Sequence, residues 1–167
     1  MILVVSICVL FYVGFMVFMI SGLFKHTDLE IKSSETLPNV SVVVAARNEE
    51  VHLPHLISDL ISQEYPLDKL EVIIVNDRST DDTAAILDDA SDNYAFIKVI
   101  TIDQVSKDMT PKKNALTKGI EAAFGEIIVL TDADCRVGTL WVSSMAYSVM
   151  SKEGISIGFS EINQHKS

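Results

Sequence analysis

Short β-branched apolar runs alternate along the chain with stretches whose apolar residues recur at helical spacing. Four of these runs predict β-strands: VSVVVAA (40–46), EVIIVND (71–77), AFIKVITI (95–102) and EIIVL (126–130). After Glu126 the fourth run is continuously apolar, which is typical of a buried strand. GISIGF (154–159) predicts a fifth strand.

The stretches between these runs predict helices. One helix face, at the i, i+3, i+4 spacing, consists of Leu53, Leu56, Ile57, Leu60 and Ile61. Further helices are predicted over 79–90, over 111–124 and over 139–152. The first of these three opens with Ser79-x-x-Asp82, a pattern that predicts a capped N-terminus.

Strands that alternate with helices of about ten residues or more imply βαβ units. Such units build a mainly parallel sheet with helices on both faces, so the sequence predicts an α/β fold. Ligands of these sheets bind beyond the carboxyl ends of the strands. Polar residues follow three of the predicted strands: Arg47, Asn48 and Glu49, then Asp77 and Arg78, then Asp132 and Asp134. We therefore expect the three groups to share one edge of the sheet.

The N-terminal segment contains no charged residue through Phe24, and as a helix it would be about 36 Å long. This length predicts a transmembrane helix at 1–24, before a polar linker at 25–39 and a domain at 40–167. A cleaved signal peptide and a buried core helix are the alternatives, but the segment lacks a basic n-region and a clear cleavage site. Basic residues follow it: Lys25, His26 and Lys32. Under the positive-inside tendency they place the domain on the cytoplasmic side of a membrane as a single-pass protein.

Asp132 and Asp134 are separated by one residue at the end of the fourth predicted strand. In an extended segment alternate side chains face the same way, so both carboxylates point toward one site. Mg²⁺ and Mn²⁺ take oxygen ligands, and Mg²⁺ is often held by one or two carboxylates together with substrate phosphates. The pair therefore favours a partial metal site, with a solvated turn or a helix cap as the alternative.

Asp77 is placed to accept hydrogen bonds from a ribose or a base, or to cap the helix that begins near Ser79. No G-x-G-x-x-G motif follows the first strand, so a metal ion would have to neutralise bound phosphates. Lys112 and Lys113 are either point charges for a phosphate or solvated residues at a helix start.

Charge and cysteine content narrow the possible functions. The chain has 13 basic and 23 acidic residues, a net charge of −10, which argues against nucleic acid as a partner. Cys8 and Cys135 match neither a disulfide framework nor a zinc spacing, so both are expected to be reduced.

Four motifs in this order, VSVVVAARNEE, VIIVNDRSTDDT, KKNALTKGI and IIVLTDADC, resemble the nucleotide-sugar-binding half of family 2 glycosyltransferases, which have the GT-A fold. The resemblance covers about residues 39–160. It implies an inverting glycosyltransferase that moves a sugar from a nucleotide-sugar donor, with UDP-sugars favoured, to an acceptor hydroxyl. By analogy, a cytoplasmic domain on one membrane anchor suggests an envelope glycan or a lipid-linked glycan as the acceptor. It also implies Mn²⁺ or Mg²⁺ as the cofactor.

The resemblance implies roles for individual residues. The segment Ala45, Ala46, Arg47, Asn48 and Glu49 lines the nucleotide, Asp77 contacts the base and Lys112 lies near the nucleotide. Asp132 falls near the ribose and the metal, and Asp134 is the principal metal ligand.

Two positions depart from the family pattern, since Ala45 replaces a frequent proline and Thr117 a frequent asparagine. The catalytic base of the family comes from its later, acceptor-binding half, so it is expected beyond Ser167, and activity of this chain alone is not implied.

A phosphatase of the haloacid dehalogenase type is an alternative that the sequence disfavours, because in those enzymes the Asp-x-Asp follows the first strand. A truncated, non-catalytic membrane-anchored interaction domain or a gene remnant is the other alternative.

Overall fold

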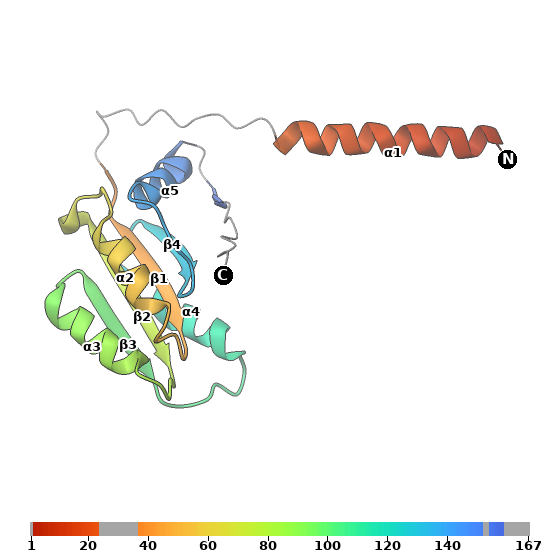
Figure 1. Cartoon of the computed structure of the whole chain (residues 1–167). Coiled ribbons are helices and arrows are strands. Elements are labelled where there is room, and N and C mark those ends of the chain that lie inside the picture. Colours follow the sequence, from red (N-terminus) through yellow and green to blue (C-terminus); the bar gives the residue numbers. More distant parts are fainter. Residues whose placement is uncertain (1, 24–36, 152–153, 159–167) are drawn as a thin grey trace, which may run out of the picture. The chain divides into compact units, whose positions relative to one another are not determined.

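The computed structural model describes residues 2–23, 37–151 and 154–158 (Figure 1). Contacts divide the chain into two compact units, residues 1–30 and 31–167. The helices and strands in chain order are α1 (Ile2–Leu23), β1 (Val40–Ala46), α2 (Leu53–Ile61), the 3₁₀ turn η1 (Leu67–Lys69), β2 (Leu70–Asp77), α3 (Thr83–Asn93), β3 (Ile97–Ile102), α4 (Pro111–Ala122), β4 (Ile127–Asp132) and α5 (Trp141–Met150).

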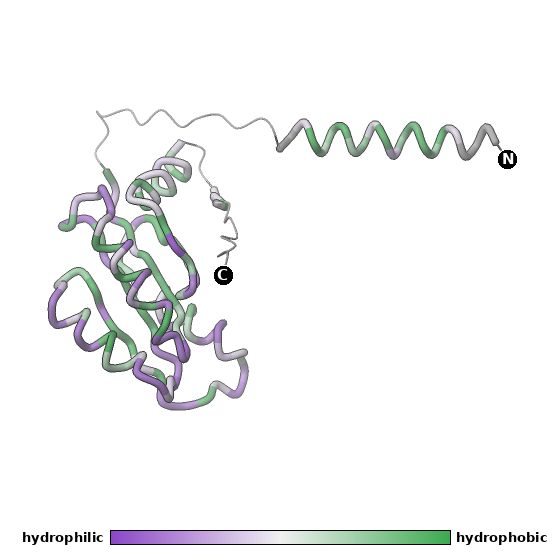
Figure 2. Tube along the Cα trace, viewed as in Figure 1, coloured by the Kyte–Doolittle hydropathy of each residue, from purple (hydrophilic) through white to green (hydrophobic). Residues whose placement is uncertain are grey.

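The first unit contains the helix α1, along which hydrophobic residues predominate (Figure 2). Its apolar side chains are exposed, with 72% of Leu10 and 79% of Phe11 accessible to solvent. Among the residues that the structure describes, however, no helix is long and apolar enough to cross a membrane. The transmembrane helix predicted over 1–24 is therefore not supported. Most of the predicted linker lies outside the described residues.

The second unit is built on a four-stranded sheet in the order β3-β2-β1-β4. All three strand pairs are parallel, with Val40 of β1 opposite both Leu70 of β2 and Ile127 of β4. The predicted parallel α/β fold is confirmed for this unit.

Helices cover both faces of the sheet, because the central strands are apolar on both sides. Val42 and Val44 of β1 belong to a large core that includes residues of α2, α3 and α5. Val43, on the other face, packs in a smaller core with Ala115 of α4. Gly119 allows α4 to approach the sheet closely, since a Cβ at this position would run into side chains of β1 and β2.

The edge strand β4 and the segment after α5 differ from the predictions. Ile128 and Leu130 are 40% and 48% exposed, so β4 is buried on one face only and not on both. α4 lies over β1 and β2 and leaves this face of β4 open. Residues 154–158 form no strand, so the fifth strand predicted there is wrong over the described positions. The helix predicted over 139–152 is confirmed as α5.

A buried carboxylate links the amino-terminal ends of the two central strands, β1 and β2. Glu71 of β2 is 2% exposed. It accepts hydrogen bonds from the Ser41 hydroxyl, from the Phe124 amide at 2.8 Å and from Lys98 Nζ at 2.9 Å. The Gly125 amide donates to the Ser41 hydroxyl at 2.8 Å, so this network ties the turn between α4 and β4 to the two central strands.

Acidification is expected to destabilise this unit through Glu71. Burial by itself raises the pKa of the carboxyl, but its three hydrogen-bond donors hold the pKa below the ordinary 4.5. A lowered folded-state pKa stabilises the fold above the unfolded-state pKa, and this stabilisation is lost as the pH falls through the folded-state value. We expect the urea midpoint, followed by fluorescence of the single tryptophan, Trp141, to drop below pH 4.5.

Glu71→Gln is expected to remove this part of the pH dependence and to lower the midpoint at pH 7. Glu121→Gln is the matched control, because Glu121 forms only an exposed pair with Lys118 on α4. Equal pH profiles for Glu71→Gln and the unmodified chain would contradict the assignment.

Candidate functional site

The candidate site lies at the carboxyl ends of the strands, beside the point where the strand order reverses. β2 and β3 extend the sheet on one side of β1, and β4 pairs on the other side. The crossovers diverge at such a point and leave a crevice above the strand ends. A cavity of about 260 Å³ is present there, lined by Ala45, Ala46, Arg47, Glu49, Asp77, Pro111, Lys112, Ala115, Asp132, Ala133 and Asp134.

The cavity brings together nearly all residues predicted for the site. Of the predicted nucleotide-binding and metal-binding residues, the lining contains Ala45, Ala46, Arg47, Glu49, Asp77, Lys112, Asp132 and Asp134. Asn48 and Lys113 do not line it. The expectation that three groups of polar residues share one sheet edge is confirmed.

Asn48 instead connects the loops that follow β1 and β2. It adopts a left-handed backbone conformation with φ of 56°. Its amide donates to the Ser79 hydroxyl at 3.0 Å, and its side-chain oxygen accepts from the Thr80 amide at 2.8 Å. Next to it, the Glu49 amide donates to the Thr83 hydroxyl at 2.8 Å. These contacts position the backbone of the cavity wall.

The capping prediction for α3 is wrong. The helix begins at Thr83, after the N-cap residue Asp82, whose side chain makes no capping hydrogen bond. The Ser79 hydroxyl accepts from Asn48 instead, so its partner comes from another loop and not from its own helix.

Asp77 is 3% exposed, and its carboxylate meets the guanidinium of Arg78. Arg78 Nε and Nη2 lie 2.8 and 3.2 Å from the two carboxylate oxygens. Arg78 has a φ of 56°, in the region that most side chains avoid. Asp77 therefore lines the cavity with both of its carboxylate oxygens paired to Arg78, which does not line the cavity itself. Asp77 does not cap α3, whose N-cap is Asp82.

Asp132 and Asp134 are both exposed and flank Ala133, which is 3% exposed and packs in the core. Lys112 Nζ lies 2.8 Å from Asp132 Oδ1, and this hydrogen bond raises the pKa of the lysine. Burial raises the pKa of the Glu49 carboxyl, and the charge of Asp134 raises it further. The cavity therefore combines converging acids with two basic side chains, Arg47 and Lys112.

This donor set suits a hard divalent cation. No group of three or more histidine, cysteine or acidic residues close enough to hold a metal ion occurs among the described residues. Two exposed carboxylates in a cavity with room for a phosphate fit a cation that takes its other ligands from substrate and water. His52 and His55 are exposed on the surface, and Cys135 is a free thiol.

The family model described as glycosyl transferase family 2 matches residues 41–163. The chain belongs to this family. It is 34% identical over 122 residues to a probable glycosyltransferase, YdaM, of Bacillus subtilis (strain 168), a match that covers 73% of this chain and 29% of the relative. It is 37% identical over 115 residues to the beta-monoglucosyldiacylglycerol synthase of Nostoc sp., covering 69% of this chain and 24% of that protein.

Solved structures of glycosyltransferases share the fold. The mannosyltransferase PcManGT of Pyrobaculum calidifontis, in complex with GDP-Man and Mn²⁺, superposes with a TM-score of 0.62 at 26% identity, over 76% of this chain and 36% of that one. S. aureus TarS in complex with UDP-GlcNAc superposes with a TM-score of 0.56 at 26% identity, over 68% of this chain and 31% of that one. This family 2 chain thus spans well under half the length of these relatives and neighbours.

The sequence analysis did not single out four residues in or near the cavity, which lie on α4, on α2 and after β4. Pro111 and Ala115 of α4 line the wall. Asp59 of α2 and Arg136 form an ion pair beside the turn that carries Asp134. They are separated by 77 positions, and no local pattern marks either of them.

Proposed function

We propose that this chain is the donor-binding part of an inverting, metal-dependent glycosyltransferase that uses a nucleotide sugar. The observation that carries the proposal is the convergence of Asp132, Asp134 and Lys112 on one cavity beside β1, in a chain of family 2. PcManGT and TarS have been solved with GDP-Man and UDP-GlcNAc, which supports a nucleotide-sugar donor.

Each cavity residue has a role in this proposal. Asp77 accepts a hydrogen bond from the base, and Ala45, Ala46, Arg47 and Glu49 form the wall against the nucleotide. Asn48 positions that wall from behind.

The phosphates lie at the other wall of the cavity. Lys112 contacts a phosphate once it leaves Asp132, and Asp132 and Asp134 are the protein ligands of Mn²⁺ or Mg²⁺. A bound cation would offset the negative charge of the diphosphate leaving group.

In the proposed reaction an acceptor hydroxyl displaces the nucleoside diphosphate at C1 of the sugar with inversion. The base that takes the hydroxyl proton is assigned to the acceptor-binding part of the family and to no acid of this cavity. The acceptor is proposed to be an envelope glycan or a lipid-linked glycan. The name of one relative, poly-beta-1,6-N-acetyl-D-glucosamine synthase, supports a glycan acceptor, and the name of another, beta-monoglucosyldiacylglycerol synthase, supports a lipid as part of the acceptor.

Membrane localisation, with the domain on the cytoplasmic side, is part of the proposal. The exposed apolar side chains of α1 support it. Fractionation of cells that produce the whole chain, with and without residues 1–24, tests it: recovery of both forms in the same fraction would contradict it.

Calorimetric titration of the whole chain with UDP and GDP, each with Mn²⁺ and with EDTA, tests donor binding. We expect one nucleotide, UDP in preference, to bind with Mn²⁺ and to lose at least about tenfold in affinity with EDTA, because Arg47 and Lys112 share the cavity with several acids and do not by themselves neutralise a diphosphate. A folded chain that binds neither nucleotide would overturn the proposal.

The same titration separates the proposal from a non-catalytic interaction domain. The exposed apolar side chains of Ile128 and Leu130 on β4 favour that alternative, since such surfaces mark contacts with other proteins. An interaction domain requires no metal-dependent nucleotide binding.

A further inference from the structure

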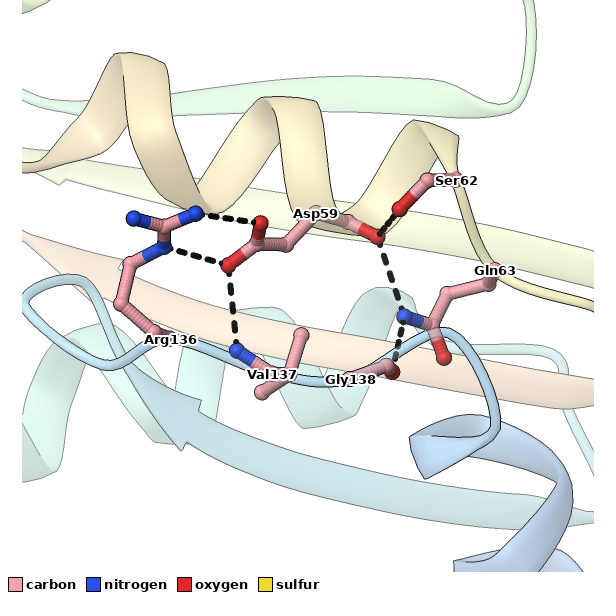
Figure 3. A network of polar contacts seen from close by, with 6 residues as sticks. All are labelled: Asp59, Ser62, Gln63, Arg136, Val137 and Gly138. Atoms are coloured by element: carbon pink, nitrogen blue, oxygen red, sulfur yellow. Dashed lines mark hydrogen bonds and ion pairs between the residues drawn. The ribbon is translucent and has the colours of Figure 1, made fainter. Parts of the chain in front are cut away.

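The turn that carries Asp134 is held from outside the cavity by a carboxylate on α2. Asp59 accepts hydrogen bonds from Arg136 Nε at 2.6 Å and Arg136 Nη2 at 2.8 Å, one on each carboxylate oxygen. It also accepts from the Val137 amide at 3.1 Å. Figure 3 shows the guanidinium and the carboxylate face to face, with the Val137 amide directed at the same carboxylate. The Asp59 side chain is only 13% exposed.

Gln63, one turn further along, holds the next part of the same segment. Its side-chain nitrogen donates to the Gly138 carbonyl at 2.8 Å and to the Asp59 carbonyl at 3.0 Å (Figure 3). Its side-chain oxygen accepts from the Val142 amide at 2.9 Å, in the first turn of α5. Gln63 is 7% exposed, so these bonds are shielded from water. Asp59 of α2 and Gln63 just after this helix therefore hold the segment 136–142 by hydrogen bonds.

Asp134 lies in the short turn between the end of β4 and the residues that Asp59 contacts, Arg136 and Val137. The last pair of the β1–β4 ladder is Ala45 with Asp132. Beyond it, the turn has one backbone hydrogen bond of its own, from the Cys135 amide to the Asp132 carbonyl at 3.2 Å. The Asp134 side chain is exposed. Its position therefore depends on the ladder before it and on the contact of Arg136 and Val137 with Asp59 after it.

We infer that Asp59 is a positioning residue for the metal-binding turn. It does not touch the cavity, but it holds Arg136 and Val137 so that Asp134 stands beside Asp132 before any ligand arrives. A metal site gains affinity when its ligands are held in place by partners outside the coordination sphere, and loss of such a partner typically costs about 10–100-fold. The inference rests on the proposed function, because it concerns the affinity of the same site.

The test is calorimetric titration of the whole chain with UDP in the presence of Mn²⁺ and in the presence of EDTA. For Asp59→Ala we expect affinity for UDP to fall about tenfold with Mn²⁺. Affinity with EDTA is expected to stay unchanged, because the base and wall contacts come from β1 and β2. If Asp59 had a merely structural role, Asp59→Ala would weaken the affinity for UDP by the same factor with Mn²⁺ and with EDTA.

Two further variants keep the test informative if Asp59→Ala folds poorly. Asp59→Asn retains acceptors for Val137 and one N–H of Arg136, so we expect an intermediate loss, about threefold. Arg136→Ala removes the ion pair from the other side, where the side chain is 59% exposed. Its loss of affinity for UDP with Mn²⁺ is expected to be similar to that of Asp59→Asn. Asp92→Ala, an exposed acid on α3, is the matched control and should bind as the unmodified chain does.

Amide hydrogen exchange supplies a readout without any ligand. Faster exchange at residues 133–137 in Asp59→Ala than in Asp92→Ala would support the inference, and equal exchange would overturn it. If the unmodified chain shows metal-dependent binding and Asp59→Ala, Asp59→Asn and Arg136→Ala bind as tightly, the inference alone is overturned. Absence of metal-dependent binding in the unmodified chain would overturn the proposed function and this inference with it.

Discussion

Asp134→Ala is expected to abolish most of the metal-dependent binding of nucleoside diphosphate, with a loss of about 100-fold in affinity. The cavity offers two exposed carboxylates, and Asp132 already shares an oxygen with Lys112 at 2.8 Å. Removal of Asp134 therefore leaves one partly neutralised ligand. Titration with UDP in the presence of Mn²⁺ measures the loss, and titration with EDTA is expected to show none.

The same substitution has an electrostatic consequence that requires no metal. Burial raises the pKa of Glu49, and the next largest cause is the negative charge of Asp134. Asp134→Ala is therefore expected to lower the pKa of Glu49, which carboxyl NMR titration measures. Asp92→Ala is the control for both readouts, since it removes an exposed acid of α3. Full metal-dependent binding by Asp134→Ala would assign the cation to other residues.

The sequence predicted the central sheet well because the residues of each strand form a local pattern that is typical of a buried strand. β1 and β2 are β-branched, apolar on both faces and followed by polar residues, which is the pattern of a parallel strand under helices. Because parallel strands end at the same edge, the placement of Asp77, Asp132 and Asp134 followed from the strand boundaries alone.

Other features depended on partners that are distant in the sequence. The apolar run of β4 does not reveal that Ile128 and Leu130 face away from any helix, because coverage is decided by where α4 packs. Ser79 has the sequence context of a cap, but its hydroxyl accepts a hydrogen bond from the Asn48 amide, which lies 31 positions away in the sequence.

The pairing of Asp59 with Arg136 shows the same limit at the candidate site. From the sequence alone, each residue would be predicted to be a solvent-exposed charged side chain. The two form an ion pair only because α2 packs beside the end of β4. The residues of the candidate site were therefore visible at the strand ends, whereas Asp59, which contacts the turn after β4, was not.

Gly125→Ala is expected to lower the free energy of unfolding of the sheet unit by about 2–4 kcal/mol. A Cβ at this position would lie 2.5 Å from the Ser41 nitrogen, 2.6 Å from its hydroxyl oxygen and 2.8 Å from the Val40 carbonyl carbon. Two of these atoms are backbone of β1, so the turn before β4 has to move away. That movement stretches the hydrogen bond from the Gly125 amide to the Ser41 hydroxyl, which itself donates to buried Glu71.

Urea unfolding followed by Trp141 fluorescence measures this loss, because the tryptophan of α5 packs against the main core. Gly138→Ala is the matched control, since a Cβ there meets no atom within 4 Å. Its unfolding free energy is expected to stay within about 0.5 kcal/mol of the unmodified chain. A Gly125→Ala variant as stable as Gly138→Ala would show that the turn yields without cost. The bonds among Gly125, Ser41 and Glu71 would then not be what fixes the turn before β4 to β1.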